Sequence, residues 1–106
     1  MNIWHARDRH GREIYLTQER WEHIVASHPD LDGRLEAVLE TVRRGHREQD
    51  PILPYKYTYI HRYDELPDFN CILVKVLFRT RVDNAGDQQP NDYIVTAWPT
   101  YMPSLR

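Results

Sequence analysis

Two short segments with a strand-like pattern begin the chain. Residues 2–8 and 13–16 are separated by residues 9–12, which contain Gly11, a residue that adopts a positive φ in tight turns without strain. The pattern predicts an N-terminal β-hairpin.

After the hairpin, the apolar residues recur with the period of an α-helix. Its apolar stripe, with positions i, i+3, i+4 and i+7, consists of Trp21, Ile24, Val25 and His28. Thr17 is suited to cap the first turn, because its hydroxyl can accept a bond from a free amide. Pro29 disfavours helical geometry at the residue before it, so the helix is expected to end at His28. His23 lies off the stripe.

A second amphipathic helix is predicted over residues 34–44, or from Leu31 if Asp30 is its cap. Its stripe consists of Leu31, Leu35, Val38, Leu39 and Val42. Gly45 follows as the expected C′ residue, the position after the helix end that often has a positive φ.

The second half of the chain has strand patterns. They cover residues 46–49, 55–63, 71–80 and 92–98, joined by polar segments at 50–54, 64–70 and 83–91. The segment 83–91 is expected to be a mobile hairpin loop, and Pro99 and Pro103 are expected to end regular structure.

Alternation assigns side chains to faces in these strands. In 71–80, Ile72, Val74, Val76 and Phe78 share one face, and Lys75 stands among apolar residues on the other. In the last strand, the predicted faces are Tyr93, Val95 and Ala97 against Ile94, Thr96 and Trp98.

Together these patterns predict one α+β domain over residues 1–106. It has an N-terminal β-hairpin, two α-helices and an antiparallel β-meander of three to four strands. The helices are expected to cover one face of the sheet and leave the other to solvent or a ligand.

The composition of the chain limits which kinds of binding site and which cellular location suit it. The net charge of −2 and the pI of about 6.3 do not suit a strongly basic nucleic-acid binder, although twelve of the fourteen basic residues are Arg, which suits a local phosphate site. Cys71 is the only cysteine, which excludes an internal disulfide and a thiolate zinc site. The N-terminal segment has no signal-peptide pattern and no apolar run is long enough to span a membrane, so a cytoplasmic location is expected.

Three short motifs distinguish this chain from an ordinary α+β domain. They are Tyr15-Leu16-Thr17, Trp21-Glu22-His23-Ile24 with His28-Pro29, and Tyr93-Ile94-Val95-Thr96-Ala97 after a hydrophobic strand with a lysine. With them, most of the chain resembles the phage-type nucleases of the barnase–EndoU–colicin–RelE (BECR) group. The resemblance implies a metal-independent RNase, often a toxin, with its cleavage site on the open face of an antiparallel sheet.

Metal-free RNA cleavage needs a base for the ribose 2′-hydroxyl, an acid for the leaving oxygen and donors for the phosphorane charge. On this hypothesis His23 transfers protons, with His28 as its partner or as an orienting group. Lys75 is the cation and Thr96 a phosphate-binding hydroxyl. The expected substrate-binding residues are Tyr59, His61, Arg79 and Trp98, the aromatic rings being able to stack on a base.

No metal or cofactor is predicted. His23 and His28 are five residues apart, which does not match the i, i+4 pair of zinc hydrolases, and no acidic residue stands at a diagnostic spacing as a third ligand.

The candidate catalytic residues also suit purely structural roles. His23 suits an exposed helix position, His28 packing beneath the second helix, and Lys75 a stem lying over Leu73 and Leu77. Two hypotheses therefore stand. The first is a small endoribonuclease, as the toxin of a toxin–antitoxin or prophage module with an antitoxin partner. The second is a non-catalytic RNA- or protein-binding module on the same scaffold.

Overall fold

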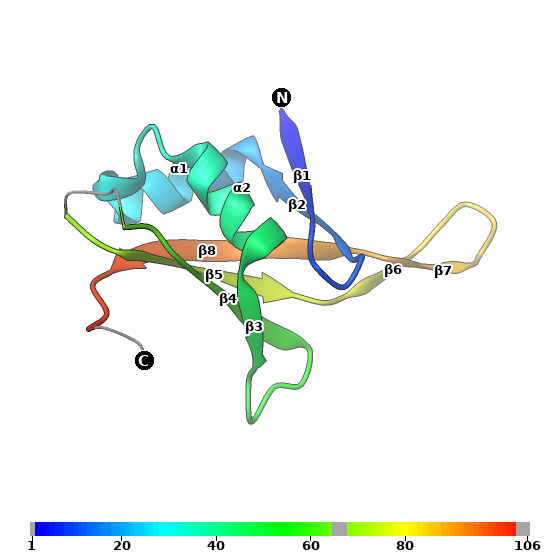
Figure 1. Cartoon of the computed structure of the whole chain (residues 1–106). Coiled ribbons are helices and arrows are strands. Elements are labelled where there is room, and N and C mark those ends of the chain that lie inside the picture. Colours follow the sequence, from blue (N-terminus) through cyan, green and yellow to red (C-terminus); the bar gives the residue numbers. More distant parts are fainter. Residues whose placement is uncertain (1, 65–67, 104–106) are drawn as a thin grey trace.

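A computed structural model describes residues 2–64 and 68–103 (Figure 1). Within them the α+β arrangement is confirmed, with two α-helices and a mostly antiparallel sheet. The elements are β1 (Ile3–Arg7), β2 (Glu13–Thr17), α1 (Gln18–Ser27), the 3-10 turn η1 (Pro29–Leu31), α2 (Leu35–Arg44), β3 (His46–Gln49), β4 (Lys56–Arg62), β5 (Cys71–Leu77), β6 (Thr80–Val82), β7 (Gln88–Pro90) and β8 (Asp92–Thr100).

The main sheet has six strands in the order β1-β2-β8-β5-β4-β3. The N-terminal hairpin joins this sheet through β2, which pairs with β8 in parallel at Ile14 and Tyr15. The sequence predicts a fully antiparallel sheet, and this junction is the exception. It arises because the last strand of the chain inserts between the hairpin and β5.

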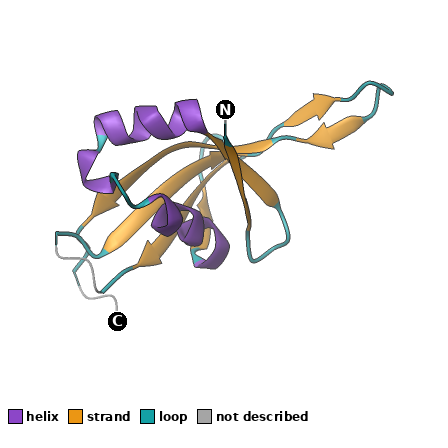
Figure 2. Cartoon of the chain, turned by 90° about the horizontal axis from the view of Figure 1, so that it is seen from above, coloured by secondary structure: helices purple, strands orange, loops and turns teal. Residues whose placement is uncertain are grey.

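Both helices lie on one side of the sheet (Figures 1 and 2). The Thr17 hydroxyl accepts a bond from the Arg20 amide at 3.1 Å, and His28 is the C-cap of α1, as its sequence predicts. One core joins the helix and sheet layers. Its buried residues are Ala6, Ile14, Leu16, Ile24, Leu31, Val38, Leu39, Val42, Tyr59, Phe69, Ile72, Val74, Val76, Ile94 and Ala97.

The pairing of β5 with β8 contains a β-bulge. Lys75 pairs with Thr96 while Val76 pairs with Ile94, so Val95 is the extra residue. The bulge reverses the alternation beyond Ile94. Ile94 and Ala97 therefore both face the core, whereas Tyr93, Thr96 and Trp98 share the other face. The predicted faces of this strand are wrong for that reason.

Two segment predictions also change. The polar segment 83–91 is not all loop. Residues 83–87 form the tip of a hairpin arm, and residues 88–90 are β7, which pairs with β6 in the part of the arm that projects beyond the sheet (Figure 2). β8 continues through Pro99, which lies opposite Ile72, to Thr100. The turn predicted over 64–70 includes residues 65–67, which are outside the described part of the chain.

The chain turns sharply from α2 into β3 at Gly45. Its φ is −66°, so it is not the positive-φ residue expected after the helix. Glycine is required here by space. A Cβ would meet the Thr41 carbonyl oxygen and would lie 2.6 Å from that of Ile60.

Candidate functional site on the open face of the sheet

The face of the six-stranded sheet opposite the helices, here called the open face, carries a line of polar side chains. Glu48 pairs with Thr58, Thr58 with Lys75, and Lys75 with Thr96. Directly opposed residues have Cβ atoms about 5 Å apart on the same face. These four residues, the transverse row, therefore present a carboxylate, two hydroxyls and an ammonium group side by side.

Lys75 is the centre of the transverse row. Its neighbours on β5, Val74 and Val76, are fully buried in the core, so the lysine side chain points away from the helices. The Lys75 Nζ atom lies 5.3 Å from the centre of the Trp98 ring. The predicted cation, the predicted hydroxyl Thr96 and the predicted stacking residue Trp98 thus lie together.

His46 adds an imidazole to the same face. It stands two residues before Glu48 on β3 and is paired with Ile60, an open-face residue of β4. Its Nε2 atom is 3.6 Å from Glu48 Oε1, and both side chains are exposed, at 61% and 67%. The pair lies on the edge strand β3, at the end of the transverse row that begins with Glu48.

The two histidines of α1 are not part of this arrangement. His23 is exposed on the helix, and His28 is half-buried at its C-cap, one residue before η1. Among the described residues, no hydrogen bond, ion pair or ring contact joins either of them to Lys75 or Thr96. The expected four-residue catalytic set is therefore divided between the helix layer and the open face.

Tyr59 belongs to the core and offers no ring surface to a base. It is 1% exposed, and its hydroxyl donates to Asp8 Oδ2 at 2.5 Å. Burial first, and the contact with Asp8 next, raise the pKa of Tyr59 far above its usual value. The Arg47 guanidinium completes the cluster, 3.2 Å from Asp8 Oδ2. The sequence prediction failed because β4 alternation puts Tyr59 opposite Val74 on the core face.

The two remaining residues predicted to bind substrate, His61 and Arg79, lie away from the transverse row. His61 is half-buried beside Tyr63, with ring centres 5.0 Å apart, on the core side of β4. Arg79 follows β5, and its guanidinium lies 5.1 Å from the Tyr55 ring. Neither residue belongs to the transverse row.

A cavity of about 600 Å³ occupies the other end of the open face. The rings of His5, Tyr15 and Tyr93 run across β1, β2 and β8 at this end, with centres 6.4 and 5.9 Å apart. His5 and Tyr15 line the cavity, and the arm contributes Arg81 and Pro90. This cavity is an open hollow beside a row of aromatic rings.

Sequence reasoning missed His46, Glu48 and Thr58. The pattern predicts a short strand at residues 46–49, but which of its side chains face Lys75 depends on the register of β3 on β4, which a local pattern does not encode. The described residues contain no group of three or more His, Cys, Asp or Glu that would hold a metal ion. None of the described helices is both long and apolar enough to cross a membrane.

Comparison of the chain with protein-family models, curated proteins and solved structures finds no match.

Proposed function

We propose that the protein is a small metal-independent endoribonuclease that cleaves RNA on its open face. The observation that carries the proposal is the transverse row, which sets Lys75 between the hydroxyls of Thr58 and Thr96. A lysine flanked by hydroxyl donors suits a phosphate that gains negative charge in the transition state. The nuclease resemblance of the Thr96 strand points to the same face.

The proposed reaction uses the substrate's own nucleophile. Glu48 accepts the proton of the ribose 2′-hydroxyl, whose oxygen attacks the phosphorus. The bond from phosphorus to the 5′ oxygen breaks, and protonated His46 donates a proton to that oxygen. The products are a 2′,3′-cyclic phosphate and a free 5′-hydroxyl. Lys75, Thr58 and Thr96 bind the phosphorane oxygens, and Trp98 stacks on an adjoining base.

The charge distribution supports RNA on this face despite the net charge of −2. The strand register places the basic side chains of Arg7, Lys56, Arg62 and Lys75 on the open face, and in the same paired strands it places the carboxylates of Glu13 and Glu48 there. On the opposite side the helices carry four carboxylates, Glu19, Glu22, Glu36 and Glu40, and three arginines, Arg20, Arg43 and Arg44. These open-face side chains therefore have a surplus of positive charge and the helices a surplus of one negative charge, a difference that favours approach of a polyanion to the open face.

The test is cleavage of single-stranded RNA in EDTA, with end-group analysis of the products. Wild type is expected to leave 2′,3′-cyclic phosphate ends. Lys75→Ala, Glu48→Gln and His46→Ala are each expected to lower kcat by about 10² or more. His23→Ala, a change on the helix layer, is the matched control and should retain wild-type kcat. Intact RNA with wild type, or full activity of Lys75→Ala, would contradict the proposal.

The alternative is an RNA-binding module without catalysis. The observation that favours it is that the α1 histidines lie on the helix layer, away from Lys75 and the open-face rings of Tyr15, Tyr93 and Trp98. It predicts that the open face binds RNA, that Trp98→Ala weakens this binding, and that wild type produces no cyclic phosphate.

We further propose a toxin role in the cytoplasm, with an antitoxin protein as partner. The nuclease resemblance supports the role, and a single free, buried cysteine suits a reducing compartment. Induced expression should arrest growth with wild type and not with Lys75→Ala at equal protein level. If wild type and Lys75→Ala both arrest growth, the toxicity does not depend on Lys75, and the proposed toxin role of the open face is contradicted.

A further inference from the structure

Two adjoining cavities follow the edge of the sheet beyond β3. One, of about 330 Å³, lies between the end of α2 and the free part of β4. The other, of about 370 Å³, lies under the turn between β1 and β2. Both are lined by Arg9 and His46, so they form one continuous surface, here called the basic groove. Its other basic lining residues are His10, Arg44, Arg47, His61 and Arg62.

No carboxylate lines the groove in the described part of the chain. Two of its guanidiniums nevertheless have close acidic partners. Arg47 is neutralised by the buried Asp8, and the Arg62 Nε atom lies 3.1 Å from Asp64 Oδ1. The groove therefore depends on its other two arginines, Arg9 and Arg44, for charge that an anion can use.

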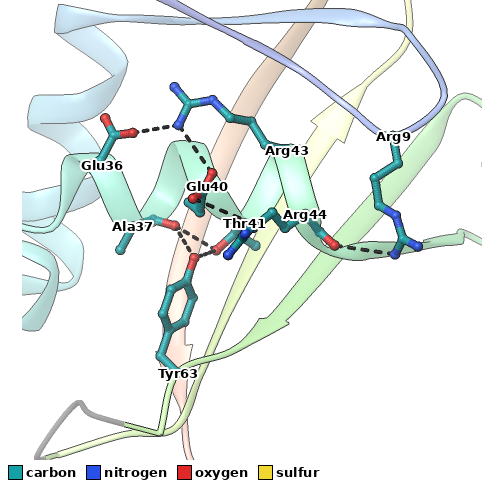
Figure 3. A network of polar contacts seen from close by, with 8 residues as sticks. All are labelled: Arg9, Glu36, Ala37, Glu40, Thr41, Arg43, Arg44 and Tyr63. Carbon is teal, nitrogen blue, oxygen red and sulfur yellow. Dashed lines mark hydrogen bonds and ion pairs between the residues drawn. The ribbon is translucent and has the colours of Figure 1, made fainter.

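Arg9 and Arg44 are less compensated. The Arg44 Nε atom is 3.9 Å from Glu40 Oε2, and its side chain is 68% exposed. Arg9 has no carboxylate within ion-pair distance among the residues that the structure describes. Its Nη1 atom donates to the backbone oxygen of Arg44 at 3.4 Å (Figure 3).

This geometry fixes the Arg9 side chain over the groove. The turn that carries Arg9 is held by Asp8, whose Oδ1 atom accepts the amides of His10 and Arg12 at 2.9 and 2.8 Å. The bond to the Arg44 carbonyl then ties the guanidinium to the end of α2, which Figure 3 shows directly. A concave surface lined by one sign of charge concentrates its field on an anion.

The groove is continuous with the open face. His46 and Arg62 belong to open-face positions of β3 and β4, and β4 extends beyond β3 at this end because His46 pairs with Ile60. A strand of RNA lying along the transverse row would therefore leave it past His46 and enter the groove.

We infer that the basic groove binds the phosphodiester backbone of the RNA on one side of the cleavage point. The natural substrate is then a single strand of several nucleotides, and short substrates forgo these contacts. The inference rests on the proposed function for the direction of the RNA path. The binding itself can be tested without cleavage.

The probe is a single-stranded 2′-O-methyl oligonucleotide, which has no free 2′-hydroxyl and cannot be cleaved. Its affinity is measured by fluorescence anisotropy over a range of salt concentrations. The double variant Arg9→Gln/Arg44→Gln is expected to bind at least about tenfold more weakly. The slope of log affinity against log salt should fall by about one for each phosphate that the variant no longer binds.

The matched control is Arg20→Gln/Arg34→Gln, which removes the same charge from the helix layer and should leave affinity and slope near wild type. Thermal unfolding of each variant checks that it remains folded. Equal weakening in both double variants, or none in Arg9→Gln/Arg44→Gln, would overturn the inference. Unchanged RNA binding in Arg9→Gln/Arg44→Gln is the result expected if the groove binds an acidic protein instead.

The two proposals fail separately. Groove-dependent binding of the 2′-O-methyl strand with no cleavage of natural RNA would contradict the ribonuclease and leave the groove in place. Cleavage of natural RNA with unchanged KM in Arg9→Gln/Arg44→Gln would contradict the groove alone. If both hold, the groove variant should raise KM for a long RNA and leave the cleavage of a dinucleotide unchanged.

Discussion

A single carboxylate connects three segments at the residue scale. Asp8 is 5% exposed and accepts two amides of its own turn, the Tyr59 hydroxyl and the Arg47 guanidinium. Burial alone would raise the pKa of Asp8, but these four donors together hold it below its usual value. The turn that carries Arg9 is thereby fixed against β3 and β4.

This pKa shift predicts a pH dependence of stability. Because the folded-state pKa is lowered, the contribution of Asp8 is fully present above about pH 4 and is lost as the pH falls through the folded value. Asp8→Asn should lower the free energy of unfolding by about 2–4 kcal/mol at neutral pH and flatten its acid dependence. Urea unfolding at several pH values measures both effects.

The control is Asp30→Asn, which removes an exposed carboxylate in η1 outside this cluster. It should change the unfolding free energy by less than about 0.5 kcal/mol. If the unfolding free energy of Asp8→Asn falls with decreasing pH as steeply as that of wild type, other carboxylates dominate the acid dependence and the prediction is contradicted.

At the scale of elements, the junction of α2 with β3 and β4 depends on one missing side chain. Gly45 brings the backbone of the helix end against the Ile60 carbonyl, in space that a Cβ would fill. The same close approach sets the end of α2 beside β4, where Arg44 and Arg62 line the basic groove.

Gly45→Ala should therefore destabilise the protein by about 3 kcal/mol, since the carbonyl oxygens of Thr41 and Ile60 are backbone atoms that cannot rotate away. Gly33→Ala is the comparison. No atom of the described residues lies within 4 Å of its added Cβ, so the strain comes from the positive φ of 78°, at about 1 kcal/mol. Thermal unfolding should rank the two changes in this order, and equal shifts in Tm would contradict the packing argument.

The whole molecule is more extended than its length implies. Its radius of gyration is 14.3 Å, against about 13 Å for a compact chain of this size. The excess comes from the arm of β6 and β7, which form a two-stranded sheet with each other and contribute none of the core residues in the described part of the chain (Figure 2). The arm also forms one wall of the open-face cavity through Arg81 and Pro90.

The arm is expected to open independently of the sheet. A two-stranded ladder without a buried apolar face is marginally stable in water, so its amides should exchange with solvent long before those of β5. Native-state hydrogen exchange can compare the Arg81 amide, which belongs to a hydrogen-bonded pair with Gln89, with the Val74 amide in a largely buried strand. Equal protection at the two amides would mean that the arm unfolds only with the whole protein.

Local signals predict the elements of this fold, whereas the site required long-range pairing. Thr17 and Pro29 delimit α1 by capping and by backbone restriction, which act within a few residues. The parallel junction of β2 with β8 and the placement of Lys75 opposite Thr96 depend on strand order and register. Helix periodicity marks His23 as unburied, but no sequence spacing could assign the sheet face on which His46 and Glu48 meet Lys75.

The bulge at Val95 has an evolutionary consequence. Because Val95 is the extra residue, its deletion would leave a regular ladder in which Thr96 stays opposite Lys75 and Ala97 opposite Val74, so each side chain keeps its face. Deletion of Ala97 would instead bring Thr96 or Trp98 into the core position opposite Val74. We therefore expect natural variants to accept many residue types at position 95, and even its loss, and to reject deletion of Ala97, which a deletion library selected for folding would reveal.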